Sequence, residues 1–189
     1  MKIRFCAEIP SDLEVSEAIT LRSLSELTRF YRLFSAQDFT FTCPTEIIAI
    51  SDQAKALSAI NTEVLAGSVD SVFTHLAWTN TPRQKGGLGE MQIPLFADLN
   101  REWGKAYGCL LDDGHHSRAT YIIDPTGVVC HISQNAPAVG RNTDEIVRLV
   151  QGYQFAAEHG EVCPANWQKG GATIKPDPKA SLEYFSKVN

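Results

Sequence analysis

The chain has 189 residues, of which 43% are hydrophobic and 21% charged, and a formal net charge of −5. This length accommodates one domain with a sizeable core, and mild acidity without a basic stripe argues against nucleic-acid binding. No apolar run approaches the roughly 20 residues that span a bilayer, and the N-terminus does not resemble a signal peptide, so we expect a cytoplasmic protein that associates with no membrane.

The first 35 residues fit two different predictions. The stretch EVSEAITLRSLSELTRFYRLF (14–34) has the partial apolar stripe of an amphipathic helix, whereas its last part, RFYRLF (29–34), fits a strand equally well. The pattern leaves both interpretations open.

A single cysteine stands between a strand-like run and a helix-like run in FTFTCPTEII (39–48). The aromatic and β-branched residues before it suit a strand, and Pro44 suits the first turn of a helix. Cys43 should therefore lie at a helix N-terminus, where free N–H groups and the helix dipole favour a thiolate. This placement indicates a chemical role.

Downstream of Cys43, apolar spacing and turn residues predict alternating helices and strands, then a hairpin and a long helix. This order indicates a mixed sheet covered by helices, and the change to Pro, Gly and Lys after Gly160 indicates a tail. In chain order the predicted elements are a helix over 44–60, a strand over 62–70, a helix capped by Asp70 or Ser71, a short strand over 93–97, a helix from Asp98 to Gly108, a hairpin over 119–133 and a helix that begins at Asn142.

The chain contains five cysteines without CxxC spacing, which argues against a zinc knuckle, a disulfide scaffold and a CxxC-type disulfide oxidoreductase. We expect Cys109 and Cys130 to be buried and inert. The adjacent His115 and His116 are expected to be solvated rather than metal ligands. Cys163, in EVCP, resembles Cys43 in being followed by proline. The sequence predicts no metal site.

A reactive thiol needs nearby hydrogen-bond donors and a route back to its starting state. Thr40 can offer a hydroxyl and Arg118 a permanent positive charge. A sulfenic acid formed on Cys43 can condense with a second thiol such as Cys163. The long separation of these cysteines along the chain leaves that pairing open.

Several segments follow one another in a specific order: DFTFTCPTEI, SVDSVFTHLAW, TPRQKGGLG, SRATYIID, VGRNTDEIVRLVQGYQF, HGEVCPANW and EYFSK. Together they resemble the typical two-cysteine peroxiredoxins, which are thioredoxin-dependent peroxidases. The resemblance implies an α/β protein with a thioredoxin-like fold, in which residues 1–160 form a central mixed sheet flanked by helices. Residues 161–189 would form a C-terminal tail that packs on the partner subunit.

The resemblance also implies a mechanism for the two Cys-Pro cysteines. Cys43 matches the peroxidatic cysteine, whose thiolate attacks hydrogen peroxide or an alkyl hydroperoxide and becomes a sulfenic acid. Cys163 matches the resolving cysteine, which forms an intersubunit disulfide with Cys43 that thioredoxin then reduces. No metal or organic cofactor is implied, and the expected assembly is a homodimer within a ring of dimers.

Four further residues match the family's active site. Thr40 resembles the residue whose hydroxyl binds the peroxide and the thiolate, and Arg118 resembles the arginine that stabilises both. Glu46 and Arg141 resemble a pair that orients this arginine. In addition, GGLG (86–89) and the dipeptide Tyr184-Phe185 resemble the motifs of peroxide-sensitive members, so we predict ready overoxidation of Cys43.

The N-terminal fifth departs from the family pattern. Ala36 stands where the family has a proline, and Arg29 and Arg32 would be costly in a strand buried on both faces. The early strands of the family are not recognisable in residues 1–28. These departures motivate an alternative from a different class, a catalytically weakened ring protein with a chaperone or structural role.

Overall fold

The computed structural model of the chain describes residues 30–34 and 37–188. It divides into two compact units, one that ends at Arg141 and one that begins at Asn142. Composition placed the boundary after Gly160, whereas the last long helix belongs to the same compact unit as the tail. No helix among the described residues is long and apolar enough to cross a membrane.

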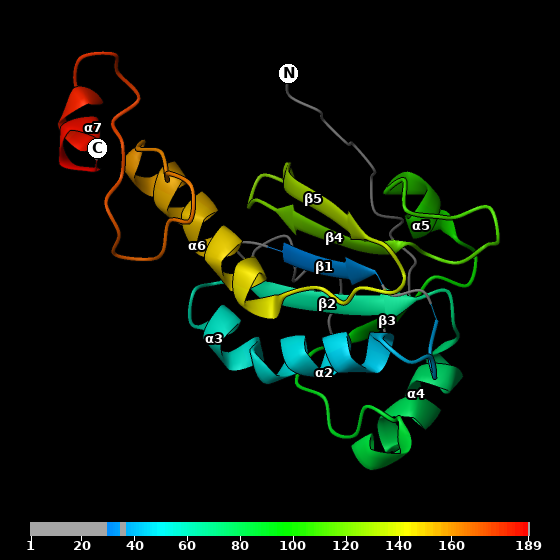
Figure 1. Cartoon of the computed structure of the whole chain (residues 1–189). Coiled ribbons are helices and arrows are strands. Elements are labelled where there is room, and N and C mark those ends of the chain that lie inside the picture. The colour runs from blue at the N-terminus through cyan, green and yellow to red at the C-terminus, as the bar shows by residue number, and fades with distance from the viewer. Residues whose placement is uncertain (1–29, 35–36, 189) are drawn as a thin grey trace. The chain divides into compact units, whose positions relative to one another are not determined.

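A five-stranded mixed sheet forms the centre of the first unit (Figure 1). The three strands β1 (Phe30–Phe34), β2 (Glu63–Ser68) and β3 (Leu95–Ala97) are parallel. The strand β4 (Arg118–Ile123) is antiparallel to β1, and β5 (Val129–Asn135) is antiparallel to β4. The predicted mixed sheet and hairpin are therefore confirmed. In spatial order the strands are β3, β2, β1, β4 and β5.

The central strand β1 decides between the two predictions for the N-terminal segment. Its backbone pairs with β2 on one side and β4 on the other, with Arg32 opposite Leu65 and Tyr121. The strand prediction is thus confirmed for Phe30–Phe34, and the helix prediction is wrong there. Residues 1–29, with Arg29, lie outside the described residues, as do Ser35 and Ala36.

The predicted helices of the first unit are present with two changes. The helix expected over 44–60 is interrupted at Gln53, and the helix expected from Asp98 begins four residues later, because the Asp98 carboxylate accepts the N–H groups of Trp103 and Gly104 from outside the helix. Ser71 caps its helix by accepting the Thr74 N–H, as predicted. The elements are α2 (Cys43–Asp52), α3 (Ala54–Ser58), α4 (Val72–Asn80), the 3₁₀ turn Arg83–Lys85 and α5 (Glu102–Ala106).

The strand β4 shows how the sheet positions the site. Its side chains alternate between the two faces, and all six of its residues are buried. One set packs in a cluster that also contains Leu65, Phe96 and Trp103, so it faces α5. The other set begins with Arg118, which contacts the first residue of α2. Burial on both faces accounts for the apolar and aromatic residues at four of its six positions.

The second unit consists of α6 (Thr143–His159), a tail and α7 (Leu182–Val188). Asn142 caps α6 by accepting the N–H groups of Asp144 and Glu145, as predicted, and Gly160 ends it with φ +68°. The tail folds back onto α6, where the Trp167 ring lies 5.3 Å from that of Phe155.

Candidate active site

Cys43 is the first residue of α2, so the prediction that it lies at a helix N-terminus is confirmed. The strand predicted for the aromatic and β-branched residues before it is wrong, because residues 37–42 form a loop of turns and bends in which Phe39 has φ +54°. Pro44 follows Cys43 in the first turn, and the N–H groups of Thr45 and Glu46 both donate to the Thr42 carbonyl. The Cys43 side chain is 1% exposed. The sulfur is therefore enclosed beside the positive end of the helix dipole.

Arg118 presents its guanidinium to this sulfur. Its Nη1 donates to Cys43 Sγ at 3.7 Å and also to the Glu46 carboxylate, and its Nη2 donates to the Pro137 carbonyl at 3.1 Å. Its Nε is buried and has no hydrogen-bond partner among the described residues. Arg118 is itself buried, so its charge is only weakly screened at Cys43.

Glu46 holds two guanidinium groups in place. Besides Arg118, it accepts three hydrogen bonds from Arg141: from the backbone N–H at 2.7 Å, from Nε at 3.0 Å and from Nη2 at 2.8 Å. Arg141 Nη1 donates to the Ala119 carbonyl of β4 at 2.8 Å. Because two positive groups share one carboxylate, the cluster carries one more positive than negative charge, which favours an anion beside Arg118.

Four of the predicted site residues therefore meet at one place: Cys43, Glu46, Arg118 and Arg141. Thr40 lies in the preceding loop, where its hydroxyl donates to the Gln37 carbonyl at 3.0 Å. Its role at the thiolate stays a prediction.

Cys163 lies in the second unit and is half-buried. Its Sγ donates to the Gly152 carbonyl at 3.7 Å. Burial raises the pKa of Cys163, and the positive charge of Arg148 opposes this increase. The pairing of Cys163 with Cys43 stays a prediction.

The remaining described cysteines differ from each other. Cys109 is 1% exposed, so the prediction of burial is confirmed, and burial raises the pKa of its thiol to about 12. Cys130 is only half-buried, and the prediction of full burial is wrong for it, because β5 is an edge strand with half-buried and exposed residues.

A buried network that the sequence did not reveal ties the loop before Cys43 to α4. Asp38 accepts a hydrogen bond from Ser68 at 2.9 Å and lies 2.5 Å from His75 Nδ1, while His75 Nε2 faces the Phe96 carbonyl at 3.0 Å. Both ring nitrogens face acceptors, an arrangement that a doubly protonated ring satisfies. Burial lowers the pKa of His75, but Asp38 outweighs it and the net pKa is raised. A single histidine within an apolar helix did not indicate this network in the sequence.

His116 corrects another expectation. We expected a solvated side chain, but His116 is fully buried and its Nε2 lies 2.8 Å from Asp98 Oδ2. Burial raises the pKa of Asp98, and the hydrogen bonds from His116, Gly104 and Trp103 lower it to below its ordinary value. Within the described residues, no group of three or more His, Cys, Asp and Glu side chains is arranged to hold a metal ion.

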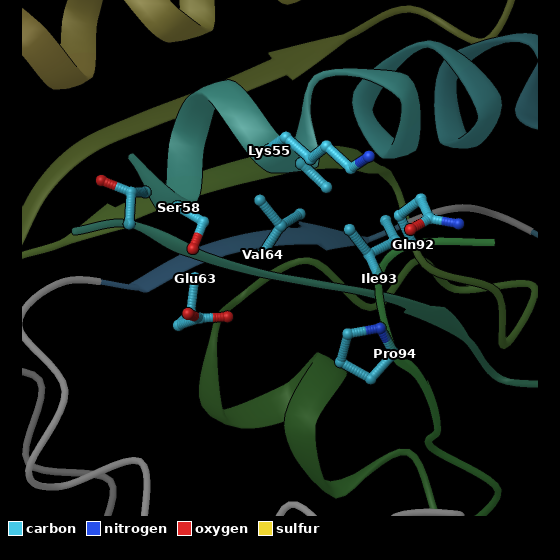
Figure 2. Close-up of a pocket in the computed structure, with 9 residues that line it drawn as sticks. Lys55, Ser58, Glu63, Val64, Gln92, Ile93 and Pro94 are labelled. Atoms are coloured by element: carbon cyan, nitrogen blue, oxygen red, sulfur yellow. The ribbon is translucent and has the colours of Figure 1, made fainter. Parts of the chain in front are cut away.

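A pocket of about 170 Å³ lies away from this site, between α3 and the residues that begin β2 and precede β3. Figure 2 shows its lining, in which Val64 and Ile93 are apolar and Lys55, Glu63 and Gln92 are polar. None of the predicted site residues lines it.

The fold and the site define a thioredoxin-like protein with a buried cysteine that faces an arginine at a helix N-terminus. The model of the AhpC/TSA family matches residues 10–132, and the model of the C-terminal domain of 1-Cys peroxiredoxin matches residues 152–187. The chain therefore belongs to the AhpC/TSA family, and its resemblance to typical peroxiredoxins is confirmed.

Individual relatives agree with this assignment. The chain is 55% identical over 157 residues to Peroxiredoxin-4 of Rattus norvegicus, an alignment that covers 82% of this chain and 58% of that protein. It is 55% identical to the mitochondrial thioredoxin-dependent peroxide reductase of Bos taurus, covering 82% of this chain and 61% of that protein. The chain thus spans about three-fifths of the length of these curated relatives.

Among solved structures, the reduced 2-Cys peroxiredoxin of Plasmodium vivax superposes with a TM-score of 0.82 at 42% identity. The superposition covers 84% of this chain and 82% of that chain. The expected thioredoxin-like fold is therefore confirmed.

Proposed function

We propose that this protein is a thiol-dependent peroxidase that reduces hydrogen peroxide and organic hydroperoxides. The observation that carries the proposal is the position of Cys43 Sγ, buried at the N-terminus of α2 and 3.7 Å from Arg118 Nη1. The excess positive charge of the cluster favours both the attacking thiolate and the oxygen that becomes negative in the transition state.

In the proposed reaction, the Cys43 thiolate attacks the nearer peroxide oxygen, an S–O bond forms and the O–O bond breaks. The leaving oxygen takes a proton and departs as water or alcohol, so that Cys43 is left as a sulfenic acid. Arg118 can stabilise the leaving oxygen through the buried Nε, which is not hydrogen-bonded within the described residues. Glu46 and Arg141 keep the guanidinium in this orientation.

Resolution requires Cys43 to leave its enclosure, because a side chain that is 1% exposed cannot reach a second thiol. Two backbone hydrogen bonds to the Thr42 carbonyl, at 3.1 and 3.4 Å, close the first turn of α2, so this turn must unwind to release the cysteine. We propose that Cys163 of the partner subunit then forms the disulfide, and that thioredoxin reduces it. The names of the thioredoxin-dependent peroxide reductases among the relatives support this reductant.

The proposed assembly is a homodimer within a ring of dimers, in which the C-terminal tail packs on the partner. The edge strand β5, with Ile132 exposed, offers one surface for such contacts, and α4, with Phe73 and Leu76 exposed, offers a second. A cytoplasmic location remains part of the proposal.

We also propose that high peroxide concentrations overoxidise Cys43. The GGLG loop is firmly held, since Leu88 is fully buried and Gly86 accepts the Trp78 indole N–H at 2.9 Å. Arg83 further joins this loop to Asp52 at the end of α2. A helix held in this way unwinds slowly, which gives the sulfenic acid time to react with a second peroxide.

The alternative function is a ring protein with a chaperone or structural role. The departures of the N-terminal fifth from the family pattern motivate it, and Phe41, which is 96% exposed, offers an apolar contact for another chain.

A non-reducing gel after one equivalent of hydrogen peroxide tests the proposal on the wild type, Cys43→Ser and Cys163→Ser. We expect a thiol-reversible dimer from the wild type and from neither variant. A wild type that stays monomeric on the gel, with Cys43 still a free thiol, contradicts the peroxidase function and favours the alternative.

A further inference from the structure

The segment that carries Cys163 is fastened to α6. The Cys163 Sγ donates to the Gly152 carbonyl of α6. The Trp167 ring and the Cys163 sulfur both lie beside Gly152, since a Cβ atom added there would lie 3.8 Å from the ring and 4.0 Å from Sγ. Trp167 is 3% exposed, and its Nε1 donates to the Gly171 carbonyl at 3.1 Å. The thiol and the indole, which the tail holds in position, therefore both lie against the same turn of α6.

Arg148 connects α6 to this segment from one turn earlier on the helix. Its Nη1 donates to the Trp167 carbonyl at 3.2 Å, while its Nε and Nη2 donate to the Glu145 carboxylate at 2.5 and 2.7 Å. This carboxylate fixes the orientation of the guanidinium, because two parallel hydrogen bonds define its plane. The positive charge also acts on Cys163, where it opposes the effect of burial on the thiol pKa.

We propose that Arg148 is a positioning residue of the resolving step, which fastens the Cys163 segment to α6 and keeps a permanent positive charge beside the Cys163 thiol. The inference rests on the proposed function and deepens it. It assigns a residue to the second half of the reaction, whereas Arg118, Glu46 and Arg141 serve the first.

In this step the Cys163 thiolate attacks the sulfenic sulfur of Cys43 of the partner subunit. An S–S bond forms and the S–O bond breaks, and the oxygen leaves with a proton as water. Cys163 is thereby oxidised and the sulfenic sulfur is reduced. Because only the thiolate attacks, the rate at neutral pH follows the fraction of Cys163 that is ionised, and a nearby guanidinium increases this fraction.

Other groups do not replace this charge. Glu161 accepts a hydrogen bond from Thr173, and His159 stacks on an aromatic ring of α6 at 4.1 Å. Among the described residues, Arg148 is the positive group that lowers the pKa of Cys163. Arg148 itself is influenced by Glu145, Cys163 and Tyr153. The other titratable residues of α6 and the following segment are Asp144, Glu158, His159, Glu161 and Lys169.

The test measures how Cys163 alkylation by iodoacetamide depends on pH, read on the Cys163 peptide by mass spectrometry. The 189-residue chain carries Cys43→Ser, so that Cys163 cannot form the disulfide. Arg148→Met removes both charge and hydrogen bonds, and Arg148→Lys retains the charge. The matched control is Arg83→Met, since Arg83 also pairs with a carboxylate, that of Asp52, but lies in the first unit.

We expect Arg148→Met to slow Cys163 alkylation at neutral pH about threefold or more, which corresponds to a pKa about half a unit higher. Arg148→Lys and Arg83→Met should leave the pH midpoint unchanged. With Cys43 restored, Arg148→Met should form the disulfide more slowly and give more Cys43 sulfinic acid in excess peroxide. Arg148→Gln, which keeps a donor without the charge, repeats the test if Arg148→Met does not fold.

An unchanged pH profile in Arg148→Met overturns the inference, and so does an equal change in Arg148→Lys, because the charge would then have no part in the effect. Failure of the proposed function is a separate result. It appears as a wild type that forms no Cys43–Cys163 disulfide, while the alkylation profile still depends on Arg148.

Discussion

Cys43 and Cys163 are each followed by proline, yet the structure surrounds them differently. Cys43 begins a helix, is 1% exposed and lies against Arg118, whose charge is shared with a buried carboxylate. Cys163 lies after a helix, is half-buried and is affected by Arg148, whose partner Glu145 is half-exposed. The same dipeptide therefore occurs in two environments, because Cys43 and Pro44 begin a helix whereas Cys163 and Pro164 follow one.

The two sites should also differ in the free energy that is lost when one partner of their ion pairs is removed. Buried ion pairs leave an uncompensated charge when one partner is removed, whereas exposed pairs contribute little because water replaces the lost contact. The first site should therefore be rigid and sensitive to substitution. Substitutions at the second site should change the free energy of unfolding little, but they should change the reactivity of the Cys163 thiol.

The largest expected effect is the loss of the buried carboxylate. Glu46→Gln leaves Arg118 and Arg141 without their counter-charge and should lower the free energy of unfolding by about 3–5 kcal/mol. Urea denaturation measures it. The matched control is Glu145→Gln, whose partner Arg148 is partly exposed, with an expected loss of at most about 1 kcal/mol. Equal losses in the two variants would contradict the distinction between the two regions.

A smaller effect on the free energy of unfolding is expected from a change in pH, and it concerns His75 in the first unit. The pKa of His75 is raised above its ordinary value, so its contribution to stability is complete below about pH 6.5 and is lost as pH rises through the folded-state value. Urea midpoints of the wild type and His75→Asn should differ most at pH 6 and converge towards pH 9. The exposed His159, changed to Asn, serves as the control and should leave the pH dependence intact. A constant difference between wild type and His75→Asn would disprove this assignment.

The smallest effect is expected on α6, next to the resolving thiol. Gly152→Ala should stabilise the protein by about 0.5–1 kcal/mol, because alanine is the better helix former and its Cβ would make ordinary contacts with Trp167 and Cys163. In contrast, Gly104→Ala in α5 would place a Cβ 2.6 Å from His116 Cδ2 and should be destabilising. Thermal and urea unfolding of both variants measure the two signs. A destabilising Gly152→Ala would indicate that the space beside Cys163 is tighter than the structure shows.

Several local features followed from the sequence because they depend on neighbouring residues. Pro44 and the residues around it indicated the helix that Cys43 begins, and Ser71 and Asn142 indicated the caps that the structure contains. The resemblance to a known family supplied Glu46 and Arg141, which no local pattern singles out. The gathering of these two with Arg118 could not be predicted from spacing, because it joins α2, β4 and the residues that precede α6.

The errors on Cys130 and His116 share one physical cause. Cys130 appeared apolar in context but lies on an edge strand, and His116 appeared to be a loop residue but is buried against Asp98. Burial is decided by which elements come to lie over a residue, and such contacts connect parts of the chain that are distant in sequence.

The sequence by itself thus determined the helix N-termini at Cys43, Ser71 and Asn142, the hairpin, the two Cys-Pro sites and the family, since propensity, capping and motif order are local properties. Only the tertiary structure decided that Phe30–Phe34 is the central strand, and that the loop before Cys43 is tied to α4 through Asp38 and His75. The physical reason is that strand pairing and buried charge pairing are satisfied between distant segments, and their free energy depends on the whole fold rather than on neighbours in sequence.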